Sequence, residues 1–370
     1  MKEKFIKDKY FNIFWVSWHR NPYNDFLFNE ISRVYKLDVY YIKEILESHP
    51  WEKKESAKYR YFELSNIKQM FSSFRKCTLP YNLRVIAGWN HPIMILMIIY
   101  LSFTRKKFVI WSDTPNTTKN RSILKLKLRN LWLKFIFKQA TKIMVTGNIG
   151  IKKMIQIGAQ KEKLINFPFA TDLNLFIPKS DNSLSKQNII FLSSGRLLNS
   201  HKGFDIAIKA FSLLKKYHPN FNFLYLIAGT GKDESALTNL IKKENLENFV
   251  KLLGWIQKNN LLAFYRTGDI FVHPSHFDPF PNVVLEAMAV GLPVVGSSSA
   301  GSVLDRVKEG VNGFIFEDGD VYQLYKKMVQ IFININNLNK MKIAARMTAE
   351  SWAVDRNINQ LTKMIYEIKN

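Results

Sequence analysis

HPSHFDPFPNVVLEAMAVGLPVVG, residues 273–296, is the most informative stretch of this chain of 370 residues. A strand candidate, Asp269–Val272, runs into it, and a proline-rich loop then leads to a small apolar helix. We expect Pro281 in the first turn of that helix, where the missing N–H of proline is not needed. The helix ends at Gly291, before another strand. This order places the positive end of a helix dipole beside the end of a strand, where an anion can bind.

The same stretch carries two acids and two amides that suit a polar ligand. Asp278 lies in the loop, and Glu286 follows eight positions later on the apolar helix. A carboxylate in so apolar a helix is costly unless it accepts hydrogen bonds, for example from two ribose hydroxyls. The alternative is a pair with a nearby cation such as Arg196. The amides of Phe280 and Asn282 are available to an anion at the start of the helix.

Two earlier strands end in glycines. Gly195 and Arg196 follow the first of them, and Lys202 comes within seven residues, so the two cations can converge on one loop and neutralise a diphosphate without a metal. Gly229 and Gly231 end the next strand and let the backbone approach a ligand. The third glycine of a dinucleotide fingerprint is absent, which argues against NAD. Ordinary surface charges and a tight turn are the alternatives.

Short strand-like runs alternate with longer amphipathic segments along the whole chain, which is the pattern of parallel sheets covered by helices. Residues 178–188 are the best linker candidate, because Leu184 is their only apolar side chain apart from the proline. The chain is long enough for two domains. The expected strands are Phe11–Trp18, Leu37–Ile42, Leu83–Ala87, Lys107–Ser112 and Ile143–Thr146 in the first half, and Asn188–Ser193, Phe223–Ala228, Val250–Leu253, Asp269–Val272 and Pro293–Gly296 in the second.

In their order, the motifs of the second half resemble the signature of family 4 of retaining glycosyltransferases. That family has two glutamates with seven residues between them, then an Ala-Met-Ala helix and a Gly-x-Pro-Val-Val strand. The resemblance implies the GT-B fold, α/β with two Rossmann-like parallel-sheet domains facing across a cleft. It implies an acceptor-binding domain over 1–180, a nucleotide-sugar-binding domain over 188–347, and a C-terminal helix over 348–370 that returns to the first domain. Further matching pairs are Leu253-Gly254, Pro274-Ser275, Ala300-Gly301 and Asn312-Gly313.

The resemblance also implies roles for single residues. Arg196 and Lys202 hold the donor diphosphate and stabilise the charge that develops on it, and Glu286 binds the ribose. Asp278 stands where the family has its first glutamate, against the donor sugar, but it is one methylene shorter. Pro279 replaces a frequent glycine and removes an amide donor. The implied catalytic set is Arg196, Lys202, Asp278 and Asp113, and the donor-binding set is Gly195, Gly229, Gly231, Phe280, Pro281, Asn282 and Glu286.

The first half offers loops that follow strands, and such loops line the ligand cleft of parallel α/β sheets. Asp113 is the only acid between positions 64 and 161, a region with 18 lysines and arginines, which favours its ionised form. It is a candidate to meet a sugar hydroxyl or an oxocarbenium ion, or else a turn or helix-cap residue. His19, Trp89 and His91 are candidates for the acceptor or sugar pocket, although histidines at loop ends are often structural.

Two mechanisms remain open for a retaining enzyme. A double displacement needs a carboxylate at the anomeric carbon, and Asp113 and Asp278 are the candidates. A front-face substitution needs no protein nucleophile, and the family resemblance favours it. No Asp-x-Asp motif is present, so we expect turnover without a metal or another cofactor.

The net charge of +24 predicts an anionic partner, namely nucleic acid, anionic lipid or a phosphorylated substrate, unless it only reflects an AT-rich genome. Residues 122–140 form a predicted helix with two apolar stripes bordered by cations. Either both stripes are buried, or the second one rests on an anionic membrane. One stripe is Leu124, Leu128, Leu131 and Phe135, the other is Ile123, Leu126, Leu133 and Phe137, and the flanking cations are Arg121, Lys125, Lys127, Arg129, Lys134 and Lys138.

A single cysteine fits a reducing compartment, and the longest apolar run, Ile93–Phe103, is too short to cross a bilayer. We therefore expect a cytoplasmic protein, peripheral at the inner face of the membrane. The resemblance implies transfer of a hexose to a glycan or lipid-linked acceptor in bacterial surface polysaccharide synthesis, such as lipopolysaccharide O-antigen, capsule or exopolysaccharide. The alternatives are a sugar-nucleotide epimerase of the same fold and a basic nucleic-acid-binding protein, for which no recognised module is present.

Overall fold

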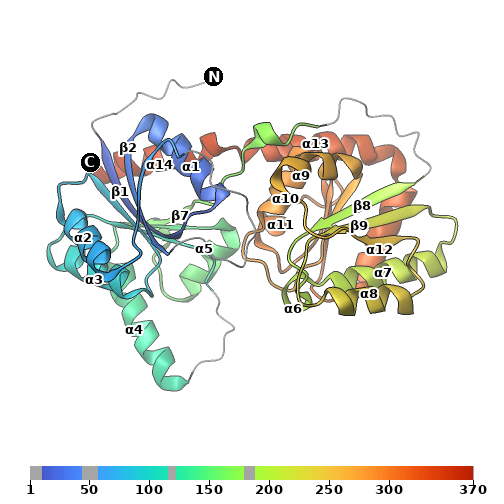
Figure 1. Cartoon of the computed structure of the whole chain (residues 1–370), viewed down its shortest axis with the longest axis horizontal. Coiled ribbons are helices and arrows are strands. Elements are labelled where there is room, and N and C mark those ends of the chain that lie inside the picture. The colour runs from blue at the N-terminus through green and yellow to red at the C-terminus, as the bar shows by residue number, and fades with distance from the viewer. Residues whose placement is uncertain (1–10, 44–56, 116–121, 179–187, 370) are drawn as a thin grey trace. The chain divides into compact units, whose positions relative to one another are not determined.

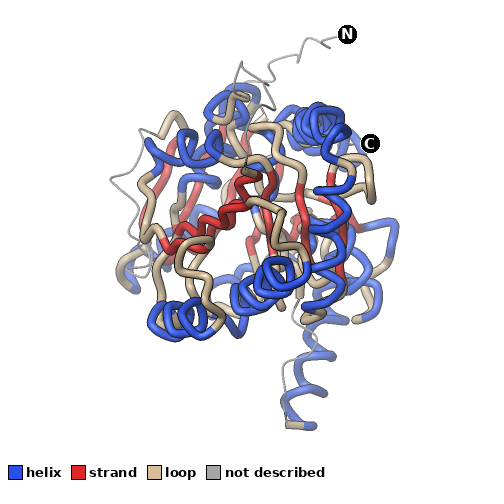
Figure 2. Tube along the Cα trace, turned by 90° about the vertical axis from the view of Figure 1, so that its right-hand side faces the viewer, coloured by secondary structure: helices blue, strands red, loops and turns tan. Residues whose placement is uncertain are grey.

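The computed structural model describes residues 11–43, 57–115, 122–178 and 188–369. The chain divides into two compact units, unit 1 (Met1–Thr171 and Val354–Asn370) and unit 2 (Asp172–Ala353). Each unit holds one parallel sheet with helices on both faces, which confirms the predicted α/β class (Figure 1). The second view shows the strands enclosed by helices (Figure 2).

The sheet of unit 1 has the strand order β3-β2-β1-β4-β5-β6-β7, and all neighbouring pairs run parallel. Strand β1 (Asn12–His19), which lies inside the sheet, is buried from Ile13 to Ser17, because helices cover both faces of the sheet. The strands are β1 (Asn12–His19), β2 (Lys36–Lys43), β3 (Arg60–Glu63), β4 (Leu83–Ala87), β5 (Val109–Ser112), β6 (Lys142–Val145) and β7 (Leu164–Asn166).

Successive side chains of β1 point into two separate cores. Ile13 and Trp15 pack with α1 (Pro22–Val34) and α14 (Val354–Lys369) on one face. Phe14 and Val16 belong to the core on the other face. The helices of that second face are α2 (Ile67–Thr78), α3 (Pro92–Phe103), α4 (Ile123–Gln139) and α5 (Gly147–Gln156).

The sheet of unit 2 has the order β10-β9-β8-β11-β12-β13 and is also parallel. Its strands are β8 (Ile189–Ser194), β9 (Phe223–Ala228), β10 (Val250–Leu252), β11 (Ile270–His273), β12 (Val294–Ser297) and β13 (Gly313–Phe316). One face carries α7 (Phe204–Tyr217), α8 (Glu234–Lys243) and α12 (Val321–Ile333), and the other carries α9 (Lys258–Thr267), α10 (Asn282–Ala289), α11 (Gly301–Arg306) and α13 (Leu338–Ser351).

The unit boundaries differ from the predicted ones at 180 and 347. Unit 2 begins at Asp172, because Phe176 packs edge-on against Tyr265 with 5.8 Å between ring centroids, and Arg346 Nη1 donates to Phe176 O at 2.9 Å. Most of the predicted linker, 178–188, lies outside the described residues. The C-terminal part that belongs to unit 1 starts at Val354, with α14, rather than at position 348.

The helix predicted over 122–140 is present as α4, but its two apolar stripes are not both buried. The C-terminal half packs in unit 1 through Leu133, Ile136 and Phe137. The helix extends beyond the sheet that it covers, so its N-terminal half projects from unit 1 (Figures 1 and 2). Its exposed apolar side chains are Ile123, Leu124, Leu126, Leu128 and Leu131. Arg121 lies outside the described residues. No helix among the described residues is long and apolar enough to span a bilayer.

Candidate functional site

Two loops of unit 2 touch at the carboxyl ends of the neighbouring strands β8 and β9. A β-carbon added at Gly229 would lie 1.8 Å from Gly195 O, and one added at Gly231 would lie 2.4 Å from Leu197 O. Gly195 N also donates to Ala228 O at 3.0 Å. The backbones approach too closely for any side chain, so these glycines are required by packing as well as by any ligand.

A third loop, after β11, joins the first two. Gly203 follows the short helix α6 (Asn199–Lys202) in the left-handed conformation, with φ 61°. A β-carbon there would lie 2.1 Å from Pro274 O, and Phe277 N donates to His201 O at 3.1 Å. These backbone contacts bring the end of α6 against the loop that carries Asp278.

Lys202 and Asp278 form an ion pair at this junction, with Lys202 Nζ donating to Asp278 Oδ2. His273, the last residue of β11, places Nε2 3.5 Å from the same oxygen and 3.0 Å from Ser275 Oγ. The three groups come from the ends of two neighbouring strands, and the sequence analysis had not expected His273 among them.

The charges at this junction follow from burial and pairing. Burial alone would raise the pKa of Asp278, but the attraction of Lys202 and the hydrogen bond from His273 outweigh it and lower the pKa to about 2. Burial lowers the pKa of His273, and Asp278 opposes this only in part. At neutral pH Asp278 is therefore ionised and His273 is neutral.

Glu286 lies on α10 with 3% of its surface exposed. Tyr265 Oη, from α9, donates to Glu286 Oε2 at 2.9 Å, and Tyr265 Oη lies 3.1 Å from Ser194 Oγ at the end of β8. A hydroxyl chain thus ties the buried acid to the first glycine loop. The sequence analysis missed Tyr265 and Ser194, since nothing marks a tyrosine on an amphipathic helix as the partner of an acid 21 positions away.

The start of α10 differs slightly from the prediction. Pro281 is the N-cap residue, with φ −63° and ψ 120°, rather than a residue of the first turn, because its ψ is extended and Asn282 begins the helix. Ser302 Oγ donates to Pro281 O at 2.9 Å, and Gly301 N donates to Asp278 O at 3.1 Å. The loop before α10 is therefore held from α11. Phe280 is buried within it.

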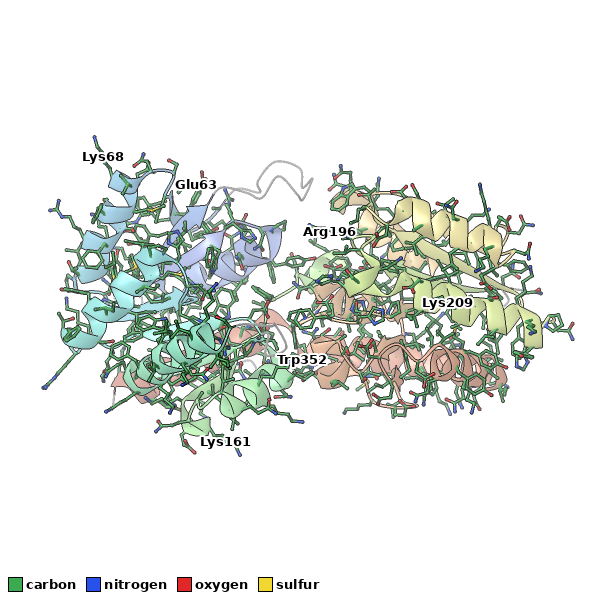
Figure 3. All side chains as sticks on the ribbon, turned by 90° about the horizontal axis from the view of Figure 1, so that it is seen from below. Glu63, Lys68, Lys161, Arg196, Lys209 and Trp352 are labelled. Carbon is green, nitrogen blue, oxygen red and sulfur yellow. The ribbon has the colours of Figure 1, made fainter. Side chains whose placement is uncertain are left out.

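Arg196 follows β8 on the same loop as Lys202, and its side chain is exposed (Figure 3). The structure thus joins Gly195, Gly229 and Gly231 through backbone contacts, and Lys202 and Asp278 through an ion pair. Among the described residues, no group of three or more histidine, cysteine, aspartate or glutamate side chains is arranged to hold a metal ion.

Aromatic side chains gather at the carboxyl ends of β1 and β4 in unit 1. The rings of Trp18 and His91 meet edge-on with centroids 5.7 Å apart. His91 caps α3, its Nδ1 accepting from Ile93 N at 3.4 Å. Trp132 of α4 donates from Nε1 to Trp89 O at 3.1 Å. Trp18 and Trp132 are additions to the predicted pair of Trp89 and His91.

The remaining candidates of unit 1 lie at the same sheet edge. Asp113, after β5, is exposed, and its Oδ1 accepts from Thr114 N at 2.8 Å and from Thr146 Oγ1, after β6, at 2.7 Å. These contacts join the ends of two strands, as expected if Asp113 is a turn residue. His19 ends β1, and its carbonyl oxygen accepts from Asn24 Nδ2 at 3.3 Å.

A buried ion pair beside His19 was not foreseen. Arg20 Nε donates to both carboxylate oxygens of Asp25, at 2.8 and 2.9 Å. Tyr59 Oη donates to Asp25 Oδ1 at 2.5 Å, and Tyr41 and Tyr59 are hydrogen-bonded at 2.8 Å. The pair fixes the turn between β1 and α1, and the only sequence signal for it is the five-residue spacing of opposite charges.

Comparison with solved structures defines the fold first. Anabaena Alr3699/HepE in complex with UDP aligns with a TM-score of 0.75 at 19% identity, covering 96% of this chain and 100% of that one. The same protein in complex with UDP-glucose aligns with a TM-score of 0.70 at 19% identity, covering 96% and 99%. With its two Rossmann-like parallel-sheet units, the chain has the GT-B fold of glycosyltransferases, as predicted.

The sequence comparison then identifies the second unit. Residues 177–348, which are most of unit 2, match the family model of glycosyl transferases group 1. An uncharacterised glycosyltransferase of Haemophilus influenzae is 28% identical over 270 residues, which are 72% of each chain. The amylovoran biosynthesis glycosyltransferase AmsK of Erwinia amylovora is 28% identical over 222 residues, 58% of this chain and 53% of AmsK.

Proposed function

We propose that this protein is a retaining glycosyltransferase that moves a hexose from a uridine diphosphate sugar to a glycan or lipid-linked acceptor. The observation that carries the proposal is the Lys202–Asp278 ion pair, placed where three loops of a group 1 glycosyl transferase domain meet. The neighbour structures bound to UDP and UDP-glucose support uridine as the base.

The donor diphosphate replaces Asp278 as the partner of Lys202. Arg196 reaches it from the same loop, and the amides of Phe280 and Asn282 meet it at the positive end of the α10 dipole. Glu286 accepts the ribose hydroxyls. Its hydrogen bond from Tyr265 links this buried acid to the glycine loop. Two cations and a helix terminus balance the diphosphate charge, so we propose that turnover needs no metal or other cofactor.

The ion pair also bears on the mechanism. Asp278 Oδ2 lies 3.5 Å from His273 Nε2, a contact that does not depend on Lys202, and this supports the front-face route over a double displacement by this carboxylate. In the front-face route the bond from the anomeric carbon to the diphosphate oxygen breaks. The acceptor oxygen bonds to the same face of the sugar, and the departing diphosphate takes the acceptor's proton. We assign Asp113, held by Thr146, to positioning rather than to nucleophilic attack.

The acceptor is proposed to bind at the carboxyl edge of the unit 1 sheet. Trp18, Trp89 and His91 present half-buried rings there, and flat rings suit the apolar faces of sugars. His19 lies at the end of the neighbouring strand β1. These side chains suit a glycan better than a small polar acceptor.

The projecting half of α4 supports a membrane-bound acceptor. It exposes five large apolar side chains and alternates them with exposed Lys125 and Lys127. An exposed apolar surface with cations beside it matches the interface of an anionic membrane. A second copy of this chain fits less well, because it brings the same positive charge. We therefore propose a peripheral protein on the cytoplasmic face of the membrane, acting in surface polysaccharide synthesis, as the name of AmsK also supports.

A thermal-shift screen against UDP-, GDP-, ADP- and CMP-sugars tests the donor, with and without EDTA. We expect stabilisation by UDP-sugars that EDTA leaves unchanged, and loss of it in Lys202→Ala and Glu286→Ala. Lys209→Ala is the matched control, since Lys209 pairs with Asp205 on the surface of α7 (Figure 3). The proposal would be contradicted if no nucleotide sugar raises the melting temperature, or if only nucleic acid raises it. A free epimer formed without acceptor would favour the epimerase.

A further inference from the structure

The most deeply buried cation among the described residues of unit 2 lies beside the proposed donor loop. Arg306, the last residue of α11, has 1% of its surface exposed. Its guanidinium carbon lies 4.5 Å from the ring centroid of Phe280 and 4.7 Å from that of Trp352. A guanidinium is flat and weakly hydrated, so it stacks well on aromatic rings away from water.

One of these rings belongs to the loop before α10, which α11 holds at further points. Gly301 N donates to Asp278 O, and a β-carbon on Gly301 would lie 2.0 Å from Pro279 O. Ser302 Oγ donates to Pro281 O. The short helix α11 therefore carries the whole loop from Asp278 to Pro281, and the stacking of Arg306 fixes the one large side chain in it.

The other ring belongs to the place where the chain leaves unit 2. Trp352 is the C-cap of α13, with its N–H donating to Ala349 O at 3.0 Å. Unit 2 ends one residue later, at Ala353, and α14 of unit 1 begins at Val354. Figure 3 shows Trp352 at the end of its helix.

We propose that Arg306 is a positioning residue for the donor loop, and that its stacking on Trp352 is needed to hold Phe280 in place. Through Phe280 the stack sets the amides at the start of α10 and the backbone of Asp278. The proposal rests on the proposed function only in calling this the donor loop.

A plain space-filling role for Arg306 makes a different prediction. Methionine has a similar length and is apolar, so Arg306→Met would then keep the loop in place. A positioning role needs the flat cation and both rings. In that case Arg306→Met, Arg306→Lys and Trp352→Leu loosen the loop, while Trp352→Phe, which keeps a ring, restores it.

Amide hydrogen exchange of the full chain, followed by mass spectrometry, reads the loop without any ligand. The Gly301 amide reports its attachment directly, because it donates to Asp278 O. We expect its exchange to rise about tenfold in Trp352→Leu and in the Arg306 variants, the size of one desolvated cation–π contact. Trp352→Phe should match the wild type. Arg266→Met, which removes an arginine that donates to Ile177 O at 2.8 Å, is the matched control.

Calorimetric binding of UDP gives the second readout, with affinity expected to fall about tenfold in the same variants. Unchanged Gly301 exchange in Arg306→Lys and Trp352→Leu would overturn the proposal even if Arg306→Met fails to fold. If the Arg306 variants raise the exchange and Trp352→Leu does not, the role of Trp352 is overturned. If the wild type binds no UDP, the proposed function fails, and exchange still decides the role of Arg306.

Discussion

The carboxyl edges of the two sheets are assembled in different ways. In unit 2 the loops touch through backbone, as Gly229 against Gly195 and Gly203 against Pro274 show. In unit 1 they are joined by side chains, such as Trp132 to Trp89. Backbone contacts leave little freedom, which suits a ligand part that never varies, such as a diphosphate. Side-chain contacts are easily exchanged in evolution, which suits an acceptor that differs between relatives.

The charges differ in the same way. Lys202 of unit 2 is paired with a partly buried acid, so its charge acts over a short range within the site. Lys125 and Lys127 of unit 1 are exposed on α4, where salt screens them. Under the proposed function, one set of cations serves a small ligand, and the other serves an extended anionic surface.

Gly229→Ala is expected to have the largest effect. The new β-carbon would lie 1.8 Å from Gly195 O, and φ is 142°, so the two loops must separate. UDP affinity should fall about 100-fold or more, because a large backbone displacement removes several ligand contacts at once. Gly310→Ala is the control, since its φ of 72° is similarly strained but its β-carbon meets nothing within 4 Å. Equal UDP affinity in both variants would show that the close approach is unimportant.

The pH dependence of stability is the second test of the paired site. The pKa of Asp278 is about 2 in the folded state, below its ordinary value of 3.8. Its contribution to stability is therefore fully present above pH 3.8 and is lost as the pH falls towards 2. The loss should be about 2 kcal/mol. Urea unfolding at pH 5 and pH 2 should show Asp278→Asn losing less stability than the wild type on acidification. Parallel losses would contradict the pairing.

Membrane binding tests the other region. Leu128→Asp with Leu131→Asp should lower binding to anionic vesicles about tenfold at low salt, because apolar area is lost and negative charge is added. These side chains are 58% and 65% exposed. The matched control is Ile343→Asp with Met347→Asp on α13, at 58% and 64% exposed. Equal binding of both double variants, or binding that 0.5 M salt does not weaken, would remove α4 as the contact.

The smallest effect is expected at Asp113. Asparagine keeps the Oδ1 that accepts from Thr114 and Thr146, so Asp113→Asn should lower kcat only about threefold. Loss of a true nucleophile would lower it about 10⁴-fold. Single-turnover assays with a UDP-sugar separate the two outcomes, and a large loss would move the catalytic carboxylate into unit 1.

Much of unit 2 was predictable because backbone packing restricts the choice of residue. Gly203, Gly229 and Gly231 stand where no β-carbon fits, so glycine is visible in the sequence. The ten predicted strands are all present, since they carry continuous apolar runs. The strands β3, β7 and β13, which lie at the edges of their sheets, were missed.

The contacts that were not predicted join residues that are far apart in the chain. Tyr265 meets Glu286, and Trp352 meets Arg306, only after strands and helices have packed. The exposure of the N-terminal half of α4 was not predicted for another reason. Apolar residues on two stripes predict a helix, but which of them are buried depends on how far the helix extends beyond the sheet, and Leu128 lies past that limit.

The calorimetric affinity of UDP for the wild type, Lys202→Met and Asp278→Asn tests the central claim most directly. Lys202 is taken to exchange its carboxylate partner for the donor diphosphate. Lys202→Met should then bind UDP at least about 30-fold more weakly, the cost of removing one charge-assisted contact. Asp278→Asn should bind it more tightly than the wild type, since the competing acid is gone. Wild-type affinity in Lys202→Met, or weaker binding in Asp278→Asn, would contradict this account of the site.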